Sequence, residues 1–231
     1  MDIVEAINQR RSIRAFKPEP VPQRILREIL GLALHAPSWG NTQPWEFIIV
    51  CGSKLEEIRQ GFIQKAEDKP SPDIPPPPGF PEPYNSRRRA LGAKLFEIKG
   101  IAREDREKRW WWNLQGLRHF EAPAVIYICI DRSFYSQANG LNVWPVFDCG
   151  LVSENIVLLA AKYGLGTILQ AQAVYYPDVL RRVLGIPDSK VIVLGIAIGY
   201  PDGDDPINQF RTERELLDKV AQWYGFDQKI N

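Results

Sequence analysis

The chain has 231 residues, 45% of them apolar, and its 29 basic and 28 acidic side chains leave a formal net charge of +1. This length and apolar content are typical of one packed globular domain, which we expect to span residues 1–231. The balanced charge excludes a global electrostatic field that would draw the protein to nucleic acid or to an anionic membrane. Any phosphate group that the protein holds must therefore be held by a local cluster of side chains.

The cysteines Cys51, Cys129 and Cys149 lie far apart in apolar sequence. That distribution is typical of reduced core cysteines and shows neither a disulfide framework nor a zinc-binding spacing. The N-terminal residues lack the apolar core and the cleavage site of a signal peptide, and no window approaches about 18 consecutive apolar residues. We therefore expect a cytoplasmic protein with no metal site and no membrane segment.

A short helix is predicted over residues 2–9, and it leads directly into the segment Arg10-Arg11-Ser12-Ile13-Arg14. Arginine offers a fixed fork of charged donors to phosphate, and serine adds a short hydroxyl donor. A solvated turn is the plainer alternative, but a solvated charged face usually carries interleaved acidic residues, and this segment has none. The pattern therefore favours an anion-binding group.

The next predicted helix spans residues 22–35, and Pro37 ends it. A polar loop follows in which Ser38 and Asn41 present uncharged donors and acceptors between two prolines. The β-branched and aromatic content of residues 46–51 then predicts a buried strand. The alternative is a plain connection from helix to strand, which is plausible for Thr42 and Pro44 taken alone.

A helix is predicted from Leu55 to about Glu67, before eight prolines fall between Pro70 and Pro83. Such a segment cannot form a regular ladder of backbone hydrogen bonds, so we expect an extended loop. A flexible linker is one interpretation, but we favour an insertion at about 69–86 that lies over or beside a site.

Helical sequence resumes near Arg87 and runs in two pieces, broken near Gly100, to about Leu117. The basic run 87–89 and the three tryptophans at 110–112 could indicate nucleic-acid binding through charge and stacking. The acidic residues around them and the neutral total charge oppose that interpretation. We expect these aromatic groups to form a lid, core or dimer contacts.

Strands are predicted at 124–130, 164–169 and 191–199, and helices at 148–163 and 177–184. The helix at 148–163 is apolar nearly all round, which is typical of a central buried helix. From Tyr200 the chain is polar, but it ends in apolar residues that have no partner within the tail: Leu216, Leu217, Val220, Trp223, Tyr224 and Phe226. From the residues alone we expect a mixed α and β domain whose tail docks on another surface.

Two segments together carry a family resemblance: RRSIRAF at residues 10–16 and APSWGNTQPW at 36–45 resemble the FMN-dependent nitroreductase family. The resemblance continues at 164–167, 194–201 and 208–214, whereas residues 69 to about 113 resemble the family only loosely. The Pro-rich insertion, the 208–214 element and the Gly225-Phe226 ending resemble its nitrobenzoate-reductase-like branch. The resemblance implies an α+β fold with a mixed sheet flanked by helices. It also implies an intertwined homodimer with FMN at the subunit interface and a tail at about 200–231 that wraps the partner.

The resemblance also implies roles for individual residues. It places Arg10, Arg11 and Ser12 on the FMN phosphate and ribityl chain, and Arg14 near the pyrimidine edge, where a cation would raise the flavin potential. The remaining cofactor-binding candidates are Pro37, Ser38 and Asn41 from the other subunit, Gln170 and Ala171 through backbone groups near flavin N5, and Arg211 and Arg214 on the phosphate. We prefer Arg214 to Arg211, and the plain alternative for both is salt bridging to nearby glutamates. No protein side chain is assigned a catalytic role, because the cofactor carries the chemistry.

The activity that the resemblance implies is an FMN-dependent NAD(P)H oxidoreductase that reduces nitroaromatic, quinone or similar small-molecule acceptors by ping-pong hydride transfer through flavin N5. The sequence has no G-x-G-x-x-G for a separately bound dinucleotide and no G-x-S-x-G for hydrolysis. Other flavin chemistry on the same scaffold, such as reductive dehalogenation or flavin fragmentation, stays open. So do a flavin-binding or sensing protein without turnover and a phosphate-binding protein without flavin. The sequence does not decide between NADH and NADPH.

Overall fold

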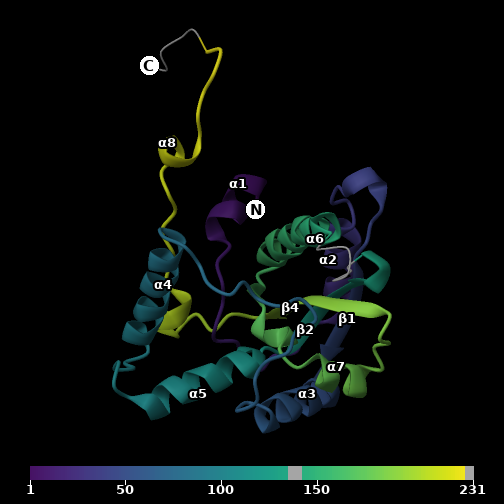
Figure 1. The fold of residues 1–231 in the computed structure, drawn as a ribbon, viewed down its shortest axis with the longest axis vertical. Coiled ribbons are helices and arrows are strands. Elements are labelled where there is room, and N and C mark those ends of the chain that lie inside the picture. The colour runs from purple at the N-terminus through teal and green to yellow at the C-terminus, as the bar shows by residue number, and fades with distance from the viewer. Residues whose placement is uncertain (135–141, 227–231) are drawn as a thin grey trace.

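The computed structural model describes residues 1–134 and 142–226, and its centre is one four-stranded sheet (Figure 1). The strands are β1 (Glu46–Cys51), β2 (Ala124–Asp131), β3 (Gly166–Gln170) and β4 (Lys190–Gly199). Their spatial order is β1-β2-β4-β3, and each adjacent pair is antiparallel. The central strands β2 and β4 are therefore paired on both sides, while β3 forms one edge.

Helices cover both faces of this sheet. On one face α2 (Gln23–Ala33) and α6 (Val143–Lys162) pack against Ile126 and Ile128 of β2. On the other face α3 (Gly52–Gln64), α7 (Pro177–Leu184) and the end of α5 (Arg106–Leu117) pack against Val125 and Tyr127. Because both faces are covered, β2 is apolar at nearly every position and does not alternate with polar residues. The expected α+β sandwich is confirmed.

The sheet is mixed only through one short contact at its edge. The four strands pair antiparallel, and the parallel pairing is an isolated bridge between Ser12 and Thr167 of β3. The N-terminal segment therefore extends the sheet beyond β3. This contact places the arginine-rich segment beside the end of α6, because β3 follows α6 directly.

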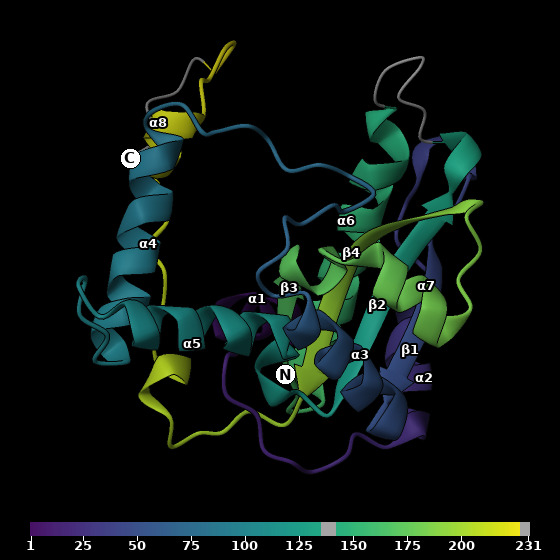
Figure 2. The same cartoon turned by 60° about the horizontal axis from the view of Figure 1, so that its bottom comes forward.

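Among the described residues, α1 (Ile3–Gln9), α4 (Tyr84–Ile98) and α8 (Leu217–Val220) lie outside the helix layers that cover the sheet, although α1 contacts α6. Figure 2 shows α4 and the start of α5 projecting away from the sheet, and Figure 1 shows the tail running past α1 away from the domain. The tail exposes its apolar side chains, by 54 to 80%, as does one face of α1: Leu216, Leu217, Val220, Trp223, Tyr224 and Phe226, with Ile3, Val4 and Ile7. An apolar set of this size on one chain indicates contact with another surface. The last residues of the predicted tail, 227–231, lie outside the described residues.

Some predicted boundaries and one burial prediction were wrong. Helix α6 begins at Val143 and not at 148, because the side chain of Asn142 accepts a hydrogen bond from the backbone N–H of Trp144 at 3.2 Å and so caps an earlier turn. Cys51 is exposed at the end of the edge strand β1, whereas Cys129 and Cys149 are buried as expected. Helix α6 is also long and apolar enough to cross a membrane by length and composition, but it packs on the sheet as a core helix does.

Candidate functional site

The segment 10–16 meets the edge of β3 at Ser12 and Ile13, and the side chain of Asn208 holds the next residue, Arg14. The N–H of Ile13 donates to the carbonyl of Thr167 at 2.9 Å, and the N–H of Arg14 donates to Oδ1 of Asn208 at 2.9 Å. A Cβ on Gly166 would lie 2.5 Å from the Ile13 side chain, so only glycine allows this close approach. The second glycine of the Gly164-Leu165-Gly166 motif thus has a packing role that brings the arginine segment onto the sheet.

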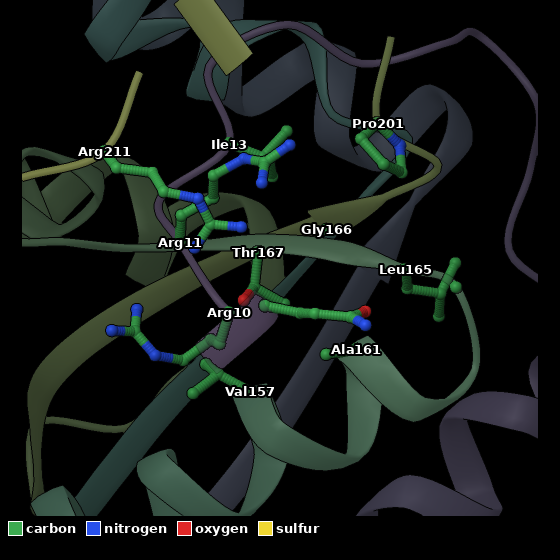
Figure 3. Close-up of a pocket in the computed structure, with 12 residues that line it drawn as sticks. Arg10, Arg11, Ile13, Val157, Ala161, Leu165, Gly166, Thr167, Pro201 and Arg211 are labelled. Carbon is green, nitrogen blue, oxygen red and sulfur yellow. The ribbon is translucent and has the colours of Figure 1, made fainter. Parts of the chain in front are cut away.

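This segment and residues 210–214 together line a positively charged pocket of about 510 Å³. Five guanidinium groups line it, those of Arg10, Arg11, Arg14, Arg211 and Arg214, together with Ser12. A smaller adjoining pocket of about 320 Å³ shares Arg10, Arg11 and Arg211 and extends over Gly166 and Thr167 (Figure 3). The structure therefore brings together six of the residues that the sequence assigns to the site.

The charge in the larger pocket is poorly compensated. Among the residues that the structure describes, Glu154 of α6 is the one carboxylate in its lining, and its Oε1 lies 3.8 Å from Nε of Arg10. Nε of Arg11 is buried and has no hydrogen-bond acceptor among the described residues. Burial lowers the pKa of Arg11, and the positive charge of Arg211 lowers it further. Because a guanidinium stays protonated under ordinary conditions, a bound anion would both reduce this repulsion and accept from the unpaired donor.

The two arginines of the C-terminal segment differ in how they are placed. The guanidinium of Arg211 donates to the carbonyl of Asn8 and lines both pockets, beside Arg11. Arg214 lines only the larger pocket and donates within its own segment, to Thr212 and to the carbonyl of Glu213. Among the described residues neither forms the salt bridge that was the plain alternative to phosphate binding, and Glu215 pairs with Arg87 and Lys219. The geometry thus gives Arg211 the closer relation to Arg11, although the sequence favoured Arg214.

The polar loop of the predicted site lies apart from the arginines. It includes the short helix η1 (Trp39–Asn41), and Gly40, Asn41 and Gln43 all have positive φ angles, of 56°, 57° and 46°. Oγ of Ser38 accepts a hydrogen bond from the backbone N–H of Gln43 at 3.0 Å. Neither arginine pocket has Pro37, Ser38 or Asn41 in its lining. Within one chain the structure does not bring the two halves of the predicted site together.

Gln170 and Ala171 lie at the end of β3. Nε2 of Gln170 donates to the carbonyl of Gly116 in α5 at 3.2 Å, while its Oε1 is buried without a partner among the described residues. Ala171 is exposed, and its carbonyl accepts a hydrogen bond from the N–H of Val174 at 3.1 Å. Neither residue lines an arginine pocket, and the contact of their backbone groups with flavin stays a prediction.

Sequence reasoning assigned no role to two residues that shape this site. Asn208 is 1% exposed and holds the arginine segment through its side chain, which accepts from the N–H of Arg14 and donates to the carbonyls of Ala15 and Asp202. The sequence feature that could have pointed to Asn208 is its position at the start of the 208–214 motif. Asp148 of α6 accepts a hydrogen bond from the N–H of Trp39. Nothing in the sequence of this apolar helix indicated that contact. Among the described residues no group of three histidine, cysteine, aspartate or glutamate side chains is placed to hold a metal ion.

Comparisons with known proteins agree with this architecture. The family model "Nitroreductase family" matches residues 7–200. The chain is 30% identical over 219 residues to the nitroreductase NfnB of Mycolicibacterium smegmatis, covering 94% of this chain and 90% of that protein. It is 31% identical over 224 residues to a nitrobenzene nitroreductase of Ectopseudomonas oleovorans, covering 95% of each. The crystal structure of the FMN and NADPH-dependent nitroreductase NfnB from Sphigopyxis sp. strain HMH superposes with a TM-score of 0.91 at 30% identity, covering 98% of this chain and all of that one. The chain belongs to the nitroreductase family.

Proposed function

We propose that the protein is an FMN-dependent NAD(P)H oxidoreductase that reduces nitroaromatic, quinone or similar electron-poor acceptors. The observation that carries this proposal is the arginine pocket, in which a buried donor of Arg11 lacks an acceptor and five guanidiniums face one carboxylate. The residues of this pocket suit a phosphate monoester, because each guanidinium offers parallel N–H donors to phosphate oxygens. Relatives named as FMN- and NADPH-dependent nitroreductases and as nitrobenzene nitroreductase support the cofactors and the acceptor class.

The protein's own residues would bind and orient the cofactor and would perform no proton transfer. Arg10, Arg11 and Arg211 would hold the phosphate, and Ser12 would add a short donor beside it. Arg14 is more deeply buried, and burial lowers its pKa, so its positive charge would act on the flavin ring through a poorly screening medium. When bound, FMN supplies the redox chemistry by accepting hydride from NAD(P)H and reducing the acceptor.

The site is proposed to be complete only in a homodimer. Pro37, Ser38 and Asn41 lie apart from the arginines of their own chain, so they would contact the FMN of the partner subunit. The exposed apolar side chains of the tail and of α1 supply a surface for such a dimer. Contact with a second copy would also remove these apolar side chains from water. We place the protein in the cytoplasm.

Anaerobic reduction tests this proposal directly. Protein saturated with FMN should lose its flavin absorbance on addition of NADH or NADPH and regain it on addition of a nitrobenzoate or a quinone. With the nicotinamide and the acceptor both varied, the initial rates should give parallel double-reciprocal lines, because the two substrates share one pocket in turn. Steady NAD(P)H oxidation with nitroarenes would also disfavour dehalogenation or flavin fragmentation as the main activity.

Two outcomes would contradict the proposal. A yellow protein that neither nicotinamide bleaches would be a flavin-binding or sensing protein. A protein that takes up no FMN on reconstitution would hold another phosphate ligand in the arginine pocket. The same assay, repeated with both nicotinamides and a panel of acceptors, identifies the preferred acceptor and the preference between NADH and NADPH by their kcat/KM values.

A further inference from the structure

The polar loop at residues 37–41 and the segment that leads into it are tied to helix α6, each by one residue of that helix. Asp148 is 2% exposed, and its two carboxylate oxygens lie 3.2 and 3.1 Å from the backbone N of Trp39, which donates to them. Nδ2 of Asn155 donates to the carbonyl of Ala33, the last residue of α2, at 3.3 Å. One contact thus precedes the loop and the other lies within it.

The spacing of the two residues places both contacts on one side of α6. Seven residues make nearly two helical turns, so Asp148 and Asn155 point to the same side, roughly 10 Å apart along the axis. Between the two attachment points lie only residues 34–38, which include Pro37 and Ser38. A short segment held at both ends by a rigid helix has little freedom to change its path.

The loop needs such support because of its backbone. Gly40, Asn41 and Gln43 have positive φ angles, and for the last two this is a sparsely populated conformation. Backbone of this kind persists only where surrounding contacts impose it. Asp148 is also costly in itself, because among the described residues its buried carboxylate accepts from a single backbone N–H.

We propose that Asp148 and Asn155 form a two-point clamp on residues 33–39, which sets where the loop at residues 37–41 begins and so positions it for FMN binding. They are positioning residues, since they act through the loop and not on the cofactor. The inference rests on the proposed function, in which this loop contacts the flavin. It adds that the geometry of the loop is set by α6 of its own chain, through Asp148 in particular.

The test compares FMN affinity with apoprotein stability in four variants. Asp148→Ala and Asn155→Ala each remove one contact, and Asp148→Asn keeps an oxygen that can accept from Trp39. Ser153→Ala is the matched control, because Ser153 is a buried polar residue of the same helix whose hydroxyl donates within that helix, to the carbonyl of Cys149 at 2.6 Å. FMN dissociation constants come from fluorescence titration of the apoproteins, and their unfolding is followed by circular dichroism.

Asp148→Ala removes a hydrogen bond to a charged group and should weaken FMN binding by roughly ten- to a hundredfold. Asn155→Ala removes a neutral hydrogen bond and should weaken it by about tenfold or less. Asp148→Asn should recover most of the affinity, and Ser153→Ala should leave it unchanged. If Asp148→Ala does not fold, the FMN dissociation constants of Asn155→Ala and Asp148→Asn, each compared with that of the wild type, test the clamp instead. Wild-type affinity in the folded alanine variants would overturn the clamp alone, and so would a loss of affinity in Ser153→Ala equal to theirs. A wild-type protein that binds no FMN would overturn the proposed function as well.

Discussion

Replacing Arg11 with alanine is expected to weaken FMN binding by roughly ten- to a hundredfold, the cost of about 1.5–3 kcal/mol for one charged hydrogen bond. The same substitution is expected to leave the apoprotein at least as stable as the wild type. Nε of Arg11 is buried without an acceptor, and the charge of Arg211 beside it lowers its pKa. In the absence of an anion, removing Arg11 therefore removes repulsion and an unpaired buried donor.

A phosphate-binding role for Arg11 predicts weaker FMN binding without a loss of apoprotein stability, whereas a structural role predicts a loss of stability. FMN affinity is measured by fluorescence titration, and stability by urea unfolding with and without FMN. Arg89→Ala is a suitable control, because Arg89 is exposed on α4 and does not line either arginine pocket. An Arg11→Ala protein that binds FMN as tightly as wild type would contradict the phosphate assignment. An apoprotein destabilised by more than about 2 kcal/mol would show that Arg11 is a structural residue.

Lowering the pH from 7 to 4 is expected to destabilise the protein by about 3 kcal/mol through His119 alone. His119 is fully buried, and its Nε2 lies 3.0 Å from the hydroxyl of Tyr127. Burial lowers its pKa to about 3, with further contributions from the positive charges of Arg59 and Arg118. In the unfolded chain the pKa is near 6.5, so below that pH the unfolded state binds a proton that the folded state does not. Stability is therefore lost as the pH falls from about 6.5 towards 3.

The matched variant for this prediction is His119→Asn. His119 has a φ angle of +56°, and asparagine tolerates this left-handed conformation better than most residues do. Urea unfolding of both apoproteins at pH 7, 5.5 and 4 gives the free energy of unfolding of each as a function of pH. The contributions of the carboxylates that the two proteins share cancel when one profile is subtracted from the other. The wild type should lose more stability than the variant between pH 7 and pH 4, by about 3 kcal/mol. Parallel profiles would contradict a neutral buried imidazole.

The sequence predicted the fold well wherever local pattern determines local structure. The apolar runs at 124–130 and 191–199 lie in the central strands, and the apolar segment at 148–163 lies in α6, the buried helix beside them. What failed depended on contacts that periodicity does not record. The start of α6 depends on the cap from Asn142, and the exposure of Cys51 depends on its place at the end of an edge strand.

The candidate site shows the same division. The arginine cluster was visible because its charges are contiguous in the sequence, and the structure adds residues 210–214 to it. The clamp on the polar loop was not visible, because Asp148 acts on a residue 109 positions away. Nor could the sequence show which of Arg211 and Arg214 lies beside Arg11, since that depends on how the tail leaves Asn208.

A site divided between two subunits is tested most directly with mixed dimers. One subunit would carry Arg10→Ala with Arg11→Ala, the other would carry Asp148→Ala with Asn41→Ala, and two affinity tags would isolate the mixed species. If the arginines of one chain and the loop of the other serve the same FMN, one site of the mixed dimer contains both defects and the other contains neither. We predict one FMN per mixed dimer, bound at wild-type affinity, although each parent homodimer binds FMN weakly at both sites. A mixed dimer with two equally weakened sites would contradict the divided site and place both halves within one chain.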